Sequence, residues 1–267
     1  MSLIRKVGAA WRKRSALGPI VNFSSATFSQ YGEDLIVDRL LKPGPEGTYV
    51  DVGANHPIAG SNTYRLYTRG WSGLAIDANP NFAADYARHR PRDTFLAEGV
   101  SREAATLTYY SYTEDVFNTF DAANAAKLLA EGRELIGRTD VRCRPLSEIV
   151  DEHLPDRAID LLCVDCEGLD LDVLASLDLT KRRPSAMIVE DGEGYLTFQQ
   201  SRPPYPLERF LRDHGYMPMA RSAWSALYVA ESWSELFARS PAFNGADLTN
   251  GYMPGDWPLP TEPIAAT

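Results

Sequence analysis

Acidic residues end five short apolar stretches of this chain, and such residues can bind hydroxyl or amino groups or accept protons. Each apolar stretch has the length of a buried strand. The five groups are Asp51 with Gly53, Asp77, Glu98 with Gly99, Asp165 with Glu167, and Glu190 with Asp191. Because ligands of parallel sheets lie beyond the carboxyl ends of the strands, we expect these residues to surround one site.

Residues 48–80 predict how the first two acids are used. An apolar strand ends at Gly53, a helix follows, and a second apolar strand ends at Asp77. Gly53 permits a tight turn and a close approach of a ligand. Asp77 is placed to accept hydrogen bonds from both hydroxyls of a ribose, and Asp51 can hold the turn or accept hydrogen bonds from an amine. The unit therefore predicts a site for a nucleoside-type cofactor.

The glycine spacing favours a cofactor without phosphates. A dinucleotide-binding turn has three glycines in the pattern G-x-G-x-x-G, whereas here the next glycine after Gly53 is Gly60. With this wider gap the following helix does not approach a pyrophosphate closely, so NAD fits less well.

The acids after the later strands predict a proton acceptor or a cation site. Crowded carboxylates raise one another's pKa, which suits a general base. Hard divalent cations take the same oxygen ligands, so a metal ion, if one is bound, would use Asp165, Glu190 and Asp191. We favour a site that needs no metal. His56, beside the predicted turn, is an alternative base.

The elements that must position these residues alternate between strand and helix. We expect strands at residues 49–52, 74–76, 94–97, 159–164, 186–189, 216–220 and 226–230, with an extra strand or hairpin arm within 101–112. We expect helices at residues 29–41, 62–69, 80–88, 118–136, 146–153, about 170–177 and 207–214. This alternation predicts an α/β fold, a doubly wound and mostly parallel sheet whose last strand pair forms an antiparallel edge.

Composition excludes several classes of protein. The 267 residues suffice for one large α/β domain with additions, and the net charge of −9 argues against a nucleic-acid partner. No stretch approaches the roughly 20 apolar residues of a membrane span, and the start lacks the apolar core of a secretory signal. Three cysteines are too few for a disulfide framework, which favours a cytoplasmic protein.

The N-terminal segment is basic within an acidic chain. Its cations are Arg5, Lys6, Arg12, Lys13 and Arg14. They could support a weak contact with a membrane surface, although a frayed or surface-packed terminal helix is the simpler interpretation.

Several motifs, taken together, resemble FkbM-type S-adenosylmethionine-dependent methyltransferases. They are FSQYGED at residues 28–34, YVDVGANHP at 49–57, SNT at 61–63, RGWSG at 69–73, IDANP at 76–80, CVDCEG at 163–168 and IVE at 188–190. The resemblance covers residues 29–230. It implies a class I methyltransferase (Rossmann-like) fold with strand order 3-2-1-4-5-7-6 and an antiparallel seventh strand. It also implies O-methylation, often of sugars, polysaccharides or other secondary metabolites.

The resemblance assigns roles to particular residues. Those expected at the cofactor are Gln30, Asp51, Gly53, Ala54, Asn55, Ser61, Asn62, Asp77, Ala78, Asn79, Glu98, Gly99 and Asp165. Asp165 is the favoured base, with Glu167, Glu190 and His56 as alternatives. The family usually has glutamate at the position of Asp77, so this shorter acid must reach further for the ribose.

The resemblance also suggests how the chain is organised. A basic leader covers residues 1–28, the methyltransferase domain covers 29–240 with an insertion at about 101–141, and 241–267 form a tail or lid. The insertion and the tail are expected to select the acceptor, a hydroxylated small molecule or glycan. Two alternatives stay open, a non-catalytic protein that binds a nucleoside cofactor and an oxidoreductase of sugar nucleotides. The oligomeric state is not set by the sequence.

Overall fold

The structure is a computed structural model of the 267-residue chain, and it describes residues 27–191 and 205–231. Apart from residues 27 and 28, the predicted leader lies outside the described residues, as does the whole predicted tail. Within the described ranges, no helix has both the length and the hydrophobicity that crossing a bilayer requires.

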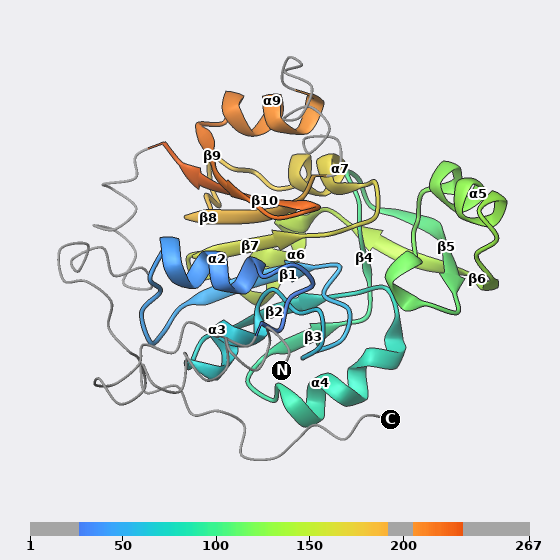
Figure 1. The fold of residues 1–267 in the computed structure, drawn as a ribbon, viewed down its shortest axis with the longest axis horizontal. Helices are drawn as coiled ribbons and strands as arrows, with labels where there is room; N and C mark the ends of the chain where they lie inside the picture. The colour runs from blue at the N-terminus through green and yellow to red at the C-terminus, as the bar shows by residue number, and fades with distance from the viewer. Residues whose placement is uncertain (1–26, 192–204, 232–267) are drawn as a thin grey trace, which may run out of the picture. The chain divides into compact units, whose positions relative to one another are not determined.

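A seven-stranded sheet in the order β3-β2-β1-β7-β8-β10-β9 forms the centre of the described chain (Figure 1). Its strands are β1 (Thr48–Val52), β2 (Ser72–Ile76), β3 (Thr94–Leu96), β7 (Leu161–Val164), β8 (Ala186–Glu190), β9 (Tyr216–Arg221) and β10 (Ser225–Ala230). Strands β3, β2, β1, β7 and β8 are parallel, whereas β10 runs antiparallel to β8 and to β9. This arrangement confirms the class I methyltransferase fold and the expected strand order.

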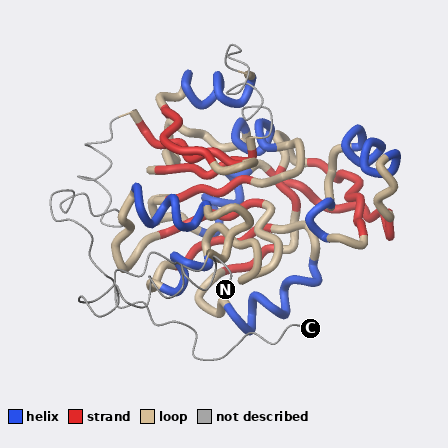
Figure 2. The backbone as a smooth tube through the Cα atoms, viewed as in Figure 1, coloured by secondary structure: helices blue, strands red, loops and turns tan. Residues whose placement is uncertain are grey.

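Helices cover both faces of this sheet (Figure 2). They are α2 (Glu33–Leu40), α3 (Tyr64–Thr68), α4 (Ala83–His89), α6 (Leu146–His153), α7 (Asp170–Ala175) and α9 (Pro206–Asp213), with a 3₁₀ turn η2 (Pro80–Phe82) before α4. Helices α6, α7 and α9 share one apolar cluster with Val50, and α2 and α3 share another with Tyr49. Because adjacent residues of a strand point to opposite faces, β1 is buried along its whole length, as its apolar sequence predicts.

A second, three-stranded sheet extends beside the central one, on the right of Figure 1. It contains β4 (Gly99–Val100), β5 (Ala105–Tyr112) and β6 (Leu135–Arg144), with η3 (Asp115–Phe117) and α5 (Ala122–Ala130) between β5 and β6. The extra strand expected within residues 101–112 is therefore confirmed. The helix expected over residues 118–136 is wrong at both ends. It begins only after Asp121, whose side chain caps it by accepting a hydrogen bond from the Ala123 amide. It ends before Gly132, which takes a positive φ of 86°, and Leu135 already pairs with Tyr112.

The first two predicted helices begin later than expected. Helix α2 starts at Glu33 because Gly32, at φ 86°, reverses the chain, and the Asp34 carboxylate binds the Thr27 and Ser29 hydroxyls ahead of it. Helix α3 starts at Tyr64, because the Ser61 hydroxyl accepts hydrogen bonds from the Thr63 and Tyr64 amides and holds a turn there.

Candidate cofactor site and active site

The carboxyl ends of β1, β2 and β7 line a cleft, and the second sheet and its connections close one side of it. The cleft encloses about 1000 Å³ of open space, part of it continuous with solvent. Among the residues expected at a cofactor, those that line it are Gln30, Asp51, Gly53, Ala54, Asn55, Asn62, Asp77, Ala78, Glu98, Gly99 and Asp165. Residues from distant parts of the sequence thus meet where ligands of parallel sheets bind.

The turn after β1 brings the backbone close to the end of β7. Gly53 has φ 75°, and a Cβ at this position would lie 1.8 Å from the carbonyl oxygen of Asp165. No side chain fits there, so the glycine is required by both conformation and space. Asn55 also lies in the left-handed region, at φ 47°, which asparagine tolerates better than most residues. The result is a narrow backbone cradle at the floor of the cleft.

Asp77 is held rigidly at the end of β2. Its two carboxylate oxygens accept hydrogen bonds from the amides of Asn55 and Asn79, each at 2.8 Å. Burial raises the pKa of Asp77 to about 6, against the two amide hydrogen bonds that favour its ionised form. Each carboxylate oxygen has a second lone pair, so this fixed group can still accept hydrogen bonds from a ribose.

Asp51 enters the same cleft from β1. Its Oδ2 atom accepts a hydrogen bond from the Thr63 hydroxyl at 2.6 Å. Burial raises its pKa to about 6, although the Thr63 hydrogen bond and the charge of Arg90 both favour the ionised carboxylate. Above that pH Asp51 offers a buried negative charge, which suits an ammonium group.

Three acids gather at the ends of β7 and β8. Oxygens of Asp165, Glu167 and Glu190 all lie within 4.8 Å of one another. Burial and the charges of Asp170 and Glu167 raise the pKa of Asp165. Burial and the charge of Asp165 raise the pKa of Glu190 to about 10, so Glu190 keeps its proton at neutral pH. Burial and the charge of Asp170 raise the pKa of Glu167 to about 7. Such a cluster can accept a proton near neutral pH.

Asp191 does not join these acids. Its carboxylate forms an ion pair with Arg221 and accepts a hydrogen bond from the Tyr228 hydroxyl. Among the described residues, the acids close enough to share a cation are therefore Asp165, Glu167 and Glu190. The set expected from the sequence had Asp191 in the place of Glu167.

Other predicted residues have different surroundings. His56 is not among the lining residues, and its Nδ1 atom accepts hydrogen bonds from the amides of Ile58 and Ala59. Glu98 lines the cleft, but both of its carboxylate oxygens bind the guanidinium of Arg144, at 2.7 and 2.9 Å.

Ser61 and Asn79 support the cleft from behind its lining. The Ser61 hydroxyl holds the turn before α3, as described above. Asn79 caps η2 through the amide of Asn81 and donates a hydrogen bond to Asp115 at 3.1 Å.

The second sheet and its connections contribute one wall of the cleft, with residues that the sequence analysis did not name. Its lining residues are Tyr109, Asp115, Val116, Asn118, Thr119 and Phe120. This part of the chain is also tied to the acid cluster, because the carbonyl oxygen of Glu167 accepts hydrogen bonds from Thr119 at 3.1 Å and from Asn124 at 3.2 Å. The sequence indicated an insertion here through the Thr- and Tyr-rich run of β5 and the alanine-rich helix, but not which of its residues would line the cleft.

The raised pKa of Glu167 predicts a pH-dependent cost to stability. Its folded pKa of about 7 exceeds the ordinary 4.5, so the stabilisation from its protonated form is complete below pH 4.5 and is lost as pH rises through 7. Glu167→Gln, neutral at every pH, should raise the free energy of unfolding by about 1–3 kcal/mol at pH 8. The gain should shrink toward zero near pH 4.5. Urea denaturation at both pH values measures this.

Glu103→Gln, at an exposed site of the chain, is the matched control and should leave stability unchanged at both pH values. A gain for Glu167→Gln that does not depend on pH would contradict the proposed origin of the effect.

The chain matches one family of known enzymes over the region that builds this cleft. The methyltransferase FkbM domain matches residues 51–218. This range runs from Asp51 at the end of β1 into β9, and it includes the second sheet. No curated protein sequence matches the chain significantly.

Solved structures with a similar fold include several methyltransferases. Methyltransferase FkbM from Methylobacillus flagellatus KT is 15% identical with a TM-score of 0.46, and the match covers 76% of this chain and 48% of that chain. The precorrin-6y C5,15-methyltransferase from Geobacter metallireducens GS-15 is 12% identical with a TM-score of 0.38, over 79% and 95% of the two chains. The O-methyltransferase TomG from Streptomyces achromogenes, in complex with S-adenosylmethionine, is 11% identical with a TM-score of 0.37, over 84% and 88%.

The present chain spans about half the length of the M. flagellatus enzyme. The family assignment rests on the domain match, which extends over more than half of the chain and contains the cradle, Asp77 and the three clustered acids. This protein therefore belongs to the FkbM methyltransferases, a family of S-adenosylmethionine-dependent enzymes.

Proposed function

We propose that the protein methylates a hydroxyl group of a sugar, a polysaccharide or a related secondary metabolite. The observation that carries this proposal is the cluster of Asp165, Glu167 and Glu190 beside the cofactor cleft. A sugar hydroxyl is a poor nucleophile unless its proton is removed as it attacks. Carboxylates whose pKa is raised toward neutrality are suited to that task.

The residues of the cleft fit S-adenosylmethionine. Its methyl group is bound to a positively charged sulfonium, and the sulfur would depart as a neutral thioether, a good leaving group. Gly53 and Ala54 line the cleft, so their backbone is accessible to a ligand there. Asp77 would bind the ribose hydroxyls, and Asp51 would bind the ammonium group of the methionine part. Placing the two reactants accounts for most of the expected rate enhancement.

The acid cluster would take the proton of the acceptor. Because Glu190 keeps its proton at neutral pH, Asp165 is the acid of this pair that would take up the proton of the acceptor hydroxyl. We assign the base to Asp165, which lines the cleft, whereas Glu190 is not among the lining residues. Glu190 would stay protonated and hold the Asp165 carboxyl in place.

We place acceptor selection in the second sheet and its connections, within a catalytic domain that spans about residues 29–240. Val116 and Phe120 of this region line the cleft, and Val116 is 43% exposed. A surface that combines apolar and polar groups beside a base suits a hydroxylated ring compound.

A panel of glycans and small hydroxylated metabolites tests the proposed function. The protein is incubated with S-adenosylmethionine and each compound, and a mass increase of one methyl group identifies an acceptor.

Activity should persist with EDTA, since the proposed base needs no metal ion; a loss that Mg²⁺ restores would assign the three acids to a cation instead. Binding of S-adenosylhomocysteine without turnover on any hydroxylated acceptor would favour a binding protein.

A further inference from the structure

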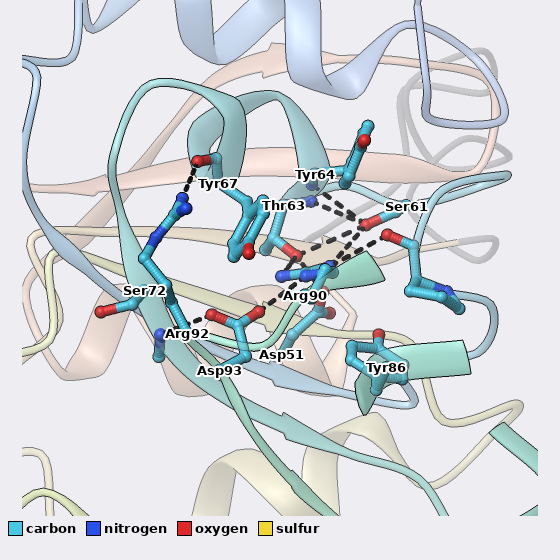
Figure 3. A network of polar contacts seen from close by, with 12 residues as sticks. Asp51, Ser61, Thr63, Tyr64, Tyr67, Ser72, Tyr86, Arg90, Arg92 and Asp93 are labelled. Atoms are coloured by element: carbon cyan, nitrogen blue, oxygen red, sulfur yellow. Dashed lines mark hydrogen bonds and ion pairs between the residues drawn. The ribbon is translucent and has the colours of Figure 1, made fainter. Parts of the chain in front are cut away.

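Figure 3 shows a buried polar network centred on Arg90. The network includes Asp51, which lines the cofactor cleft. The Arg90 side chain is fully buried. Its Nε atom donates to Asp93 at 2.6 Å, Nη1 donates to the Pro57 carbonyl at 3.3 Å and to the Ser61 hydroxyl at 3.2 Å, and Nη2 donates to the Thr63 hydroxyl at 2.9 Å. One guanidinium thus joins the end of α4 to the loop between β1 and α3.

Aromatic rings surround this guanidinium. Arg90 lies 5.2 Å from the ring centroid of Tyr49, 5.2 Å from that of Tyr86 and 5.5 Å from that of Tyr67. Rings at this distance stabilise a cation and exclude water. In such surroundings the charge of Arg90 acts on its neighbours with little screening.

The Thr63 hydroxyl connects Arg90 to the cleft. It accepts a hydrogen bond from Arg90, and it donates its own proton to Oδ2 of Asp51 at 2.6 Å. A hydroxyl has a single proton, so the bond from Arg90 favours the orientation in which this proton faces Asp51. The hydrogen bonds therefore run in one direction, from the buried cation to the acid that lines the cleft.

Several charged or titratable groups face Asp51 from the elements packed around it. They are Arg90 and Asp93 after α4, Tyr86 of α4, Asp77 at the end of β2, and Cys163 and Asp165 at β7. Asp93 and Asp77 raise the pKa of Asp51, and burial raises it more. Among the groups that contribute most, only Thr63 and Arg90 lower the pKa of Asp51.

We propose that Arg90 acts through the Thr63 hydroxyl as a positioning residue, which keeps Asp51 ionised and fixed where it binds the ammonium group of S-adenosylmethionine. This inference rests on the cofactor placement proposed above. It adds a role for two residues, Arg90 and Thr63, that are not among the residues lining the cleft.

Thr63→Val tests the proposal, because valine keeps the shape of threonine and removes the hydroxyl. Affinity for S-adenosylhomocysteine is measured by calorimetry between pH 5 and pH 8.5. In the unaltered protein it should fall as pH drops through about 6, where Asp51 takes up a proton. In Thr63→Val this midpoint should move up by about one pH unit, since a hydrogen bond to the ionised form is lost. Thr63→Ser, which restores the hydroxyl, should bring the pH midpoint back to that of the unaltered protein.

A second ligand separates Asp51 from the other groups of the cleft. Methylthioadenosine has the adenine and the ribose but no ammonium group, so Thr63→Val should leave its affinity and pH profile unchanged. Tyr49→Phe is the matched control within the network. It removes a buried hydroxyl that binds Asp93 at 2.7 Å, without interrupting the path from Arg90 to Asp51. It should lower stability and leave the pH midpoint in place.

Two results would overturn the proposal in different ways. If Asp51→Asn weakens S-adenosylhomocysteine binding and Thr63→Val leaves the midpoint where it was, Arg90 and Thr63 have only a structural role and the cofactor placement stands. If Asp51→Asn binds both ligands as tightly as the unaltered protein at every pH, the ammonium group is not at Asp51 and the placement fails as well.

Discussion

Replacing Asp165 by asparagine is expected to lower kcat by about 10²–10⁴-fold, the usual contribution of a general base. Asparagine has nearly the same shape as aspartate but cannot accept the proton of the acceptor. The Asp165 main chain should keep its place, because its amide donates to the Val52 carbonyl at 3.0 Å. The Kd for S-adenosylhomocysteine should therefore stay nearly unchanged. Single-turnover kinetics and calorimetry measure the two quantities separately.

Asp172→Asn is the matched control for this experiment. Asp172 is an acid of α7 whose side chain is 51% exposed and pairs with Arg102, and its replacement should leave kcat unaltered. Full activity of Asp165→Asn would move the base to another member of the cluster, and Glu167→Gln would then be the variant expected to lose activity.

Replacing Asp77 by alanine is expected to weaken cofactor binding by about 1–3 kcal/mol, the usual cost of an unpaired buried polar contact. This corresponds to a roughly 5- to 150-fold higher Kd. Two losses combine in this variant, because Asp77 would bind the ribose and also holds the amides of Asn55 and Asn79. Calorimetry with S-adenosylhomocysteine measures the change.

Asp77→Asn separates these two losses, since its side-chain oxygen can still accept one of the two amide hydrogen bonds. Adenosine and 2′,3′-dideoxyadenosine are compared as ligands. If Asp77 binds the ribose hydroxyls, the variant should weaken adenosine binding and have little effect on the dideoxy compound. Equal effects on both ligands would remove Asp77 from the ribose and leave it a structural role.

Some residues of the cleft could be placed from the sequence, and others could not. Asp51, Gly53 and Asp77 could be placed in one cleft from the sequence, because parallel strands end at the same edge of a sheet. The ion pair that holds the Glu98 carboxylate could not be predicted this way. Its partner Arg144 ends β6, in a strand that the sequence pattern had assigned in part to a helix.

The second sheet was the least predictable part of the fold. The alanine- and leucine-rich sequence of α5 correctly indicated a helix, but β6 is largely exposed and lacks a clear apolar alternation. It forms because it pairs with β5 over nearly its whole length. Pairing between distant segments is a tertiary property, and strand propensity depends strongly on such a partner.

By itself, the sequence determined the order of strands and helices in the central sheet, the glycine turn after β1 and the acids at the strand ends, because buried strands and tight turns leave local patterns of residue type. Only the tertiary structure decided that Glu167 joins Asp165 and Glu190 while Asp191 pairs with Arg221, and that Arg90 reaches Asp51 through Thr63. The reason is physical: burial and unscreened charge set the pKa of an acid, and both depend on segments that meet only after the chain has folded.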